Sequence, residues 1–347
     1  MVLPDTYGAA LLLTILSMLC WGSWANTFKL AGNWRFELFY YDYSLGVLIA
    51  ATAYALTFGN SGFDGFMFVD DLMHAGKRQL FYGGMGGIVF NLANMLLVAA
   101  ISVAGLAVAF PVGIGLALVI GVIWNYVLKP QGNPVLLFTG AAIVVAAIVV
   151  DALAYRALAA AKAATAVESG AKQAATKVTG RGIALSLASG VLMGSFFPLV
   201  EMGKAGPLGL GPYAIGFVFA IGVFVSTFAF NLFFMNLPVA GPPVAMWEYF
   251  KGNWRQHMLG VVGGLIWATG TIANFVAASA PDKVQVGPAI SYAIGQGATM
   301  VSALWGLLVW KEFAGADART TGFIILMLIL FVVGLALVSM APLYANS

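Results

Sequence analysis

Charged side chains are scarce in this sequence, since Asp, Glu, Lys and Arg together make up 8% of its 347 residues. Soluble domains carry about 25% charged residues, so this chain has too few for a protein that folds in water. Hydrophobic residues make up 61% of the chain, and its mean hydropathy is +0.95. The shortage of charge excludes a soluble globular protein and indicates an integral membrane protein in a lipid bilayer.

Cysteine and histidine are almost missing as well. The single cysteine, Cys20, excludes an internal disulfide framework. The two histidines, His74 and His257, are expected in connections between helices, which leaves no cluster for a metal ion and no His-based catalytic pair. We therefore predict no enzymatic activity, no metal and no cofactor. The net charge of +3 is also too small to indicate a nucleic-acid partner.

Long apolar runs are what the sequence does contain. Runs of about 20 residues, the length that a helix needs to cross hydrocarbon, recur along the whole chain. The shorter alternating segments of a β-barrel do not occur. Breaks at Gly, Pro, Asn and charged residues predict an all-α integral membrane protein with ten transmembrane helices. They cover residues 8–30, 36–58, 79–102, 105–128, 134–155, 181–203, 212–236, 256–278, 285–309 and 319–342.

The two halves of the chain resemble each other. GSWANTFKL (22–30) lines up with GSFFPLVEM (194–202), at an offset of 194 − 22 = 172 residues. Pro111 lines up with Pro288, at an offset of 288 − 111 = 177 residues, and GGIVF lines up with GGLIW at the same offset. With five helices in each copy, the second repeat enters the membrane upside down, as in many secondary transporters. We therefore expect a first five-helix repeat at 1–155, a central cytoplasmic linker at 156–180 and a second repeat at 181–347.

Lysine and arginine are shared unevenly between the two faces of this arrangement. The face with both termini carries Lys77, Arg78, Lys129, Lys204 and Lys283. The opposite face carries Arg35, Arg156, Lys162, Lys172, Lys177, Arg181, Lys251, Arg255, Lys311 and Arg319. Because positive residues favour the cytoplasm, we expect a cytoplasmic linker and extracytoplasmic termini, in a bacterial inner membrane. Three tryptophans at helix ends are expected at the membrane interface: Trp34, Trp254 and Trp310.

Polar and aromatic side chains inside the predicted spans are candidates for a solute pathway. Amides, hydroxyls and flat aromatic rings suit a small neutral polar solute such as a sugar, a ureide or a nucleobase. The candidates for binding it are Trp21, Trp24, Asn26, Asn91, Asn94, Trp267, Asn274, Tyr292 and Gln296. For each asparagine, the alternative is a hydrogen bond to a neighbouring helix. Pro111 and Pro288 are expected to break their helices beside the site.

Four acids are embedded in the predicted spans or nearly so, namely Glu37, Asp42, Asp151 and Glu201. A desolvated carboxylate can exchange protons near neutral pH, so we hypothesise that Asp42 or Glu201 couples transport to protons. The alternative is a structural ion pair. Lys29, at the end of the first helix, is expected to reach the cytoplasmic surface or to meet Glu37 or Asp42 there and close an inner gate.

Three stretches resemble known transporters. WGSWANTFKLAG (21–32) resembles the opening of the bacterial glucose/ribose porters, and YYDYSLGVLIAATAYALTFG (40–59) resembles the second helix of plant ureide permeases. SALWGLLVWKEF (302–313) is similar to the end of the ninth helix in both groups. These groups belong to the drug/metabolite transporter (DMT/EamA-like) superfamily, whose fold is ten helices in two inverted five-helix repeats.

The resemblance implies an uptake carrier for sugars, or for ureides and related purine products, with proton coupling. It also implies a role for Gln296, which matches a glutamine near the middle of the ninth helix in the sugar porters. The central segment VESGAKQAATK has no phosphate-binding G-x-x-x-x-G-K-[ST] motif, so nothing indicates ATP as a driver.

The sequence thus predicts a secondary active transporter for a small neutral polar metabolite, working by alternating access and coupled to protons for uptake. Two alternatives stay open. One is an exporter of drugs or amino acids with the same fold, and the other is a non-transporting membrane subunit or sensor. A homodimer is also open.

Overall fold

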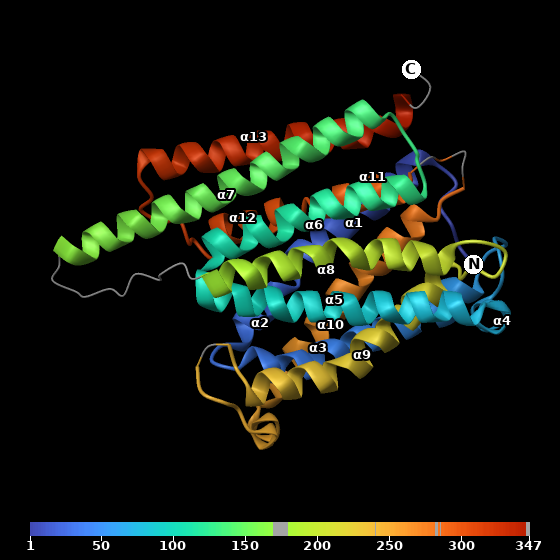
Figure 1. Cartoon of the computed structure of the whole chain (residues 1–347), viewed down its shortest axis with the longest axis horizontal. Coiled ribbons are helices and arrows are strands. Elements are labelled where there is room, and N and C mark those ends of the chain that lie inside the picture. Colours follow the sequence, from blue (N-terminus) through green and yellow to red (C-terminus); the bar gives the residue numbers. More distant parts are fainter. Residues whose placement is uncertain (169–179, 240, 282–283, 285, 345–347) are drawn as a thin grey trace.

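The computed structural model describes residues 1–168, 180–239, 241–281, 284 and 286–344 (Figure 1). Every regular element in these ranges is helical, so the prediction of an all-α protein is confirmed for the described residues. Eight helical stretches are long and apolar enough to cross a membrane. The molecule is therefore an integral membrane protein.

The long helices lie side by side in one bundle (Figure 1). They are α1 (Tyr7–Ser23), α3 (Phe36–Leu56), α5 (Lys77–Ala104), α6 (Leu106–Leu128), α7 (Pro134–Glu168), α8 (Gly180–Lys204), α9 (Pro212–Asn236), α10 (Trp254–Ala278), α12 (Ala298–Leu308) and α13 (Ala318–Met340). Short helices join them: α2 (Ala25–Ala31), η1 (Phe58–Asn60), α4 (Phe68–His74), η2 (Met246–Lys251), α11 (Pro288–Gly295) and η3 (Ala341–Tyr344). Most predicted boundaries agree with these helices to within two residues, because apolar runs and polar breaks mark them directly.

Two predicted helices are each built from two pieces. The first divides into α1 and α2 at Trp24, and the ninth divides into α11 and α12 at Gln296 and Gly297. The expected helix break at Pro288 is wrong, because this proline is the first residue of α11, where its missing N–H costs nothing. The expected break at Pro111 is also wrong, since α6 continues through it.

The fifth predicted helix is longer than expected. Helix α7 continues to Glu168, beyond the predicted start of the linker at residue 156. The rest of the linker lies outside the described residues, as do Lys172, Lys177 and Lys283, and the side chain of Lys162 is not described either.

Glycines allow the closest helix crossings. A Cβ atom at Gly46 of α3 would lie 2.1 Å from the Val261 carbonyl oxygen, and one at Gly264 of α10 would lie 2.0 Å from the Tyr43 carbonyl oxygen. Only hydrogen fits there, as is common where membrane helices pack backbone against backbone. Helices α3 and α10 are thereby held in direct contact beside the site described below.

The bundle has two distinct ends. The termini end holds Met1, α4 and η3, and the linker end holds α2, η2 and the last turn of α7 (Figure 1). Met1 is held at the termini end by its terminal ammonium, which donates to the Asp64 carbonyl oxygen at 2.6 Å.

Candidate functional site

A cavity of about 180 Å³ lies between α1, α2, α5, α6, α8, α10, α11 and α12. Both halves of the chain contribute to its wall. Among the residues predicted to bind solute, those that line it are Trp21, Trp24, Asn94, Trp267 and Gln296. Helices far apart in the sequence therefore bring much of the predicted set into one place.

Flat aromatic rings form one side of the cavity. The Trp267 ring stacks on Phe90, with ring centroids 4.3 Å apart and planes 26° apart, and on Trp21 at 6.3 Å and 15°. Trp24 packs against Tyr43 at 4.8 Å. The Trp21 indole N–H donates to the Thr271 hydroxyl at 3.0 Å, which fixes the ring. Such a wall suits a planar group that can stack.

The polar lining is neutral. Asn94 donates from its amide nitrogen to the Tyr40 hydroxyl at 3.0 Å, which orients the amide. Gln296 is 8% exposed, and its side-chain amide makes no hydrogen bond to another described residue. Thr299 and Ser302 add hydroxyls, and no charged side chain in the described ranges lines the cavity. These groups can donate to and accept from a solute without adding charge.

Asn91 and Asn274 are buried but lie outside this cavity. The Asn91 amide donates to the Ser226 hydroxyl at 2.8 Å and to the Thr227 hydroxyl at 3.1 Å, both on α9. Asn274 of α10 donates to the Ser17 hydroxyl of α1 at 3.1 Å. This geometry matches the alternative stated from the sequence, in which each asparagine hydrogen-bonds to a neighbouring helix.

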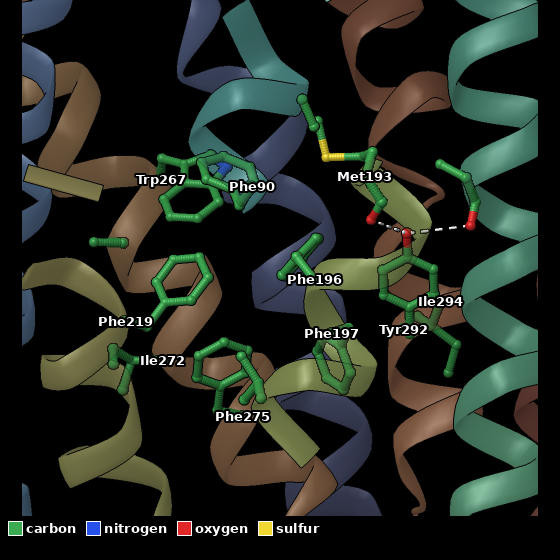
Figure 2. Close-up of a cluster of buried hydrophobic side chains, with 14 of the residues drawn as sticks. Phe90, Met193, Phe196, Phe197, Phe219, Trp267, Ile272, Phe275, Tyr292 and Ile294 are labelled. Carbon is green, nitrogen blue, oxygen red and sulfur yellow. Dashed lines mark hydrogen bonds between the residues drawn. The ribbon is translucent and has the colours of Figure 1, made fainter. Parts of the chain in front are cut away.

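Tyr292 lies outside the cavity as well. Its hydroxyl donates toward the Met193 and Ala117 carbonyl oxygens, at 3.2 and 3.4 Å (Figure 2). The ring packs against Phe197, with centroids 5.3 Å apart. Tyr292 therefore belongs to a cluster of buried aromatic side chains on the termini side of the cavity.

This cluster closes the cavity in that direction. Phe197, Phe219 and Phe275 are at most 1% exposed and pack edge to face beneath Phe196 and the Trp267 wall (Figure 2). The exposed members of the lining, Ala25 and Ser302, lie toward the linker end instead. The cavity is therefore closed toward the termini end and reached from the linker end.

Three side-chain contacts join α1 and α2 to α12 and the residues after it. The Trp305 indole N–H donates to the Ser23 hydroxyl at 2.8 Å, the Trp310 indole N–H donates to the Asn26 amide oxygen at 2.6 Å, and Lys29 pairs with Glu312. Ser23, Asn26 and Lys29 are three residues apart and so share one helix face. We call these contacts the linker-end clasp.

The clasp corrects one prediction. The partner of Lys29 is Glu312, so the expected contact with Glu37 or Asp42 is wrong. Trp310, predicted from the sequence to lie at the membrane interface, donates to Asn26, and its ring centroid lies 4.4 Å from the Lys29 ammonium, so it is part of the clasp. Sequence reasoning missed Glu312 as a functional candidate, although it lies in the SALWGLLVWKEF stretch that resembles known transporters.

Asp42 forms a second polar cluster at the linker end. Its two carboxylate oxygens accept from the Tyr249 hydroxyl at 2.6 Å and contact His257 Nδ1 at 2.8 Å. Burial and the hydrogen bond to Asp42 raise the pKa of Tyr249, which keeps this hydroxyl a donor. His257 lies in the first turn of α10, so its expected place in a connection is wrong. Trp34, predicted from the sequence to lie at the membrane interface, is 8% exposed and packs edge-on against His257, so its ring faces this cluster.

Glu201 lies at the opposite end of the bundle. The Lys204 ammonium donates to its carboxylate at 2.6 Å, one turn along α8. Both residues line a cavity of about 490 Å³ at the termini end, with Lys129 on its wall. The two carboxylates nominated for proton coupling are therefore far apart and differently paired.

Comparison with known proteins agrees with this architecture. The sequence profile of the ureide permease family matches residues 39–187 and 171–341. Ureide permease 1 of Arabidopsis thaliana is 25% identical over 387 residues, covering 97% of each chain. Ureide permease 2 of the same plant is 24% identical over 400 residues, covering 97% of this chain and 98% of its own.

A protein of solved crystal structure has the same fold. It superposes with a TM-score of 0.59 at 16% sequence identity, covering 98% of this chain and 99% of its own. The profile match and the curated relatives make the molecule a transporter of small polar solutes rather than an enzyme, and this chain belongs to the ureide permease family.

Proposed function

We propose that this protein moves a flat, uncharged, amide-bearing metabolite, of the ureide or nucleobase class, across the membrane by alternating access. The observation that carries the proposal is the cavity with stacked aromatic walls, neutral amide and hydroxyl groups and access from one end. A planar ring or ureide can stack on Trp267 while its N–H and C=O groups pair with Gln296 and Asn94. The names of the relatives, ureide permeases, agree with this class of solute.

A sugar is the second candidate from the sequence. It presents hydroxyls around a puckered ring, which need more partners than Asn94, Gln296, Thr299 and Ser302 offer. An exporter of charged drugs or amino acids fits less well, because a buried charge without an opposite partner is costly.

For the membrane topology, we propose ten transmembrane helices in two inverted repeats, at 1–155 and 181–347, joined by a linker at 156–180, in the drug/metabolite transporter fold. Helix α3 and the α11–α12 pair would add to the eight apolar spans. The proposed orientation has a cytoplasmic linker end, extracytoplasmic termini and a bacterial inner membrane. In its support, Arg35, Lys251, Arg255 and Lys311 lie at the linker end.

We also propose proton-coupled uptake. Asp42 and Glu201 remain the candidates from the sequence for the proton step, and Lys29 remains the candidate for gating through its contact with Glu312. Uptake into proteoliposomes that is indifferent to a pH gradient would contradict this coupling. A pH response that survives Asp42→Asn would remove Asp42 from it.

The solute class is tested by thermal shift of the purified protein with a ureide, a nucleobase and a pentose. A bound solute raises apparent stability by mass action, so we expect the ureide or the nucleobase to raise the melting temperature. Gln296→Leu should weaken binding about tenfold to a hundredfold, the loss of one buried hydrogen bond to the solute. Gln79→Leu, at the termini end, is the matched control. A shift with the pentose alone would overturn the proposed class.

A further inference from the structure

The four acids embedded in the spans differ in their partners. Glu37 pairs with Arg35 at 2.7 Å, and Glu201 pairs with Lys204. Asp42 has its two hydrogen bonds from Tyr249 and His257. Asp151 of α7 is 7% exposed, and its carboxyl group has no hydrogen bond or ion pair within the described part of the chain.

The surroundings of Asp151 are apolar. Its side chain borders a void of about 10 Å³ whose other walls come from α12, α13 and the segment between them, and they include Leu304, Phe313 and Met327. A void of this size has no room for a water shell around a carboxylate. An unpaired buried carboxylate is very costly, so a protonated, uncharged Asp151 is the form that fits this arrangement.

Asp151 interacts electrostatically with the clasp. Tyr155, one turn further along α7, donates from its hydroxyl to Glu312 at 3.1 Å, and Glu312 also accepts from Lys29. A negative charge on Glu312 repels a negative charge on Asp151. The charge of Asp151 therefore acts on the same carboxylate that holds Lys29.

The elements around Asp151 carry further ionisable side chains, and none of those described has a hydrogen bond or ion pair with Asp151. On α7, Arg156 is exposed, and between α12 and α13, Lys311 is exposed. Arg319 of α13 lies over the Phe323 ring at 5.7 Å, and Asp317 caps the start of α13. Within the described residues, the ionisable groups that interact electrostatically with Asp151 are thus Tyr155 and Glu312, and Lys29 is linked to it through Glu312.

We propose that Asp151 is a proton-binding residue whose proton controls the Lys29–Glu312 contact and, through it, access to the cavity from the linker end. In the structure Asp151 holds the proton and the clasp is formed. Loss of the proton to water, through the 32% exposed Glu312 side chain, leaves a second negative charge that repels the Glu312 carboxylate. This repulsion changes the contact between Glu312 and Lys29 and moves α2 relative to α12. The link to solute access rests on the proposed function, but the proton site itself does not.

The test measures access to the cavity without any solute. A Cys20→Ala chain carrying Ser302→Cys is labelled with a maleimide in detergent, and its rate is divided by that of Ser61→Cys, an exposed position at the termini end. We expect this ratio to change by up to about fivefold between about pH 5.5 and about pH 8.5 as the proton leaves, the limit that an exposed ion pair sets. With Asp151→Asn the ratio should be independent of pH, and Asp151→Glu should restore the dependence. Asp70→Asn, an exposed acid on α4, is the matched control.

The proposal is overturned when folded Asp151→Asn protein keeps the full pH dependence. A measurement on the unchanged chain guards against a variant that does not fold. Infrared spectroscopy at neutral pH should show the carbonyl band of a protonated carboxyl group, which disappears at high pH, and its absence would also overturn the proposal. Because neither measurement contains a solute, a failed transport assay would count against the proposed function and not against the proton site.

Discussion

The two ends of the bundle are held together in different ways. At the linker end, single polar contacts such as Lys29–Glu312 and Asn26–Trp310 join residues 283 and 284 positions apart. At the termini end, the Lys204–Glu201 pair spans one helical turn and joins no two helices. Long-range hydrogen bonds at that end join a side chain to the backbone, such as Tyr213 to Val2 and Asp71 to Gly211, and buried rings and glycine crossings close the cavity. Polar contacts can be exchanged with water, whereas packed rings must be pulled apart.

The energies of these contacts also indicate that the linker end is held more weakly than the termini end. An exposed ion pair is worth about 0.2–1 kcal/mol, and Lys29 and Glu312 are 44% and 32% exposed. In a membrane, helices are held by van der Waals packing, and each of the several rings in the termini-side cluster makes many such contacts that opening would break. We infer that the linker end is the easier end to rearrange from this conformation. The predictions below test this difference between the ends.

The largest effect is expected at a glycine crossing on the termini side. A Cβ at Gly222 of α9 would lie 2.2 Å from the Gly84 carbonyl oxygen of α5, which is backbone and cannot turn aside. Gly222→Leu should therefore cost about 3 kcal/mol and lower the thermal midpoint of the purified protein strongly. The control is Gly84→Ala, where a Cβ meets nothing within 4 Å, so no stability should be lost. Equal midpoints for the two variants would show that this crossing is not tightly packed.

The next effect concerns the clasp. Glu312→Gln removes the ion pair with Lys29 but keeps a side chain of the same size, so the labelling rate of Ser302→Cys should change by about fivefold or less, as expected for an exposed pair. The control is Glu248→Gln, which removes the exposed pair with Lys251 at the same end but lies outside the clasp. A change of equal size in both variants would mean that surface charge, rather than the clasp, governs access.

Sequence alone predicted the helices and part of the site, for a physical reason. Apolar runs and their breaks mark a helix locally. A polar side chain inside such a run is costly and therefore indicates a functional position, as for Trp267 and Gln296. Whether an amide faces a cavity or a neighbouring helix depends on how the helices are rotated, which no local pattern encodes. Asn91 and Asn94 therefore looked alike in the sequence, although Asn94 alone of the two lines the cavity.

Contacts between side chains far apart in the sequence could not be predicted, for the same reason. The partner of Lys29 depends on how α2 lies against the end of α12, and the sequence offered only nearby acids such as Glu37. The interruption of the ninth predicted helix lies at the Gly-Gln-Gly stretch of Gln296 and Gly297, whereas the sequence placed the break at Pro288, because a proline is a stronger local signal.

A smaller effect compares one hydrogen bond at each end. Trp305→Phe removes the bond to Ser23 at the linker end, and Tyr213→Phe removes the bond from its hydroxyl to the Val2 carbonyl oxygen at the termini end. Each should lower stability by about 1 kcal/mol, measured as the thermal midpoint. Only Trp305→Phe should also change the labelling rate of Ser302→Cys. A change in labelling with Tyr213→Phe would show that the termini end is equally mobile.

The smallest effect is a pH dependence at the termini end. Asp71 of α4 is 3% exposed and accepts from the Gly211 N–H at 2.8 Å, and burial raises the pKa of Asp71. An acid whose folded pKa lies above its unfolded value stabilises the fold most at low pH, and this contribution is lost as the pH rises through the folded pKa. Asp71→Asn should reduce the change of melting temperature with pH over this range by about 2 °C or less. Asp70→Asn, on the exposed face of α4, should leave the dependence of melting temperature on pH unchanged. An unaltered profile in Asp71→Asn would mean that Asp71 titrates as it does in the unfolded chain, and that its surroundings on α4 are open to water.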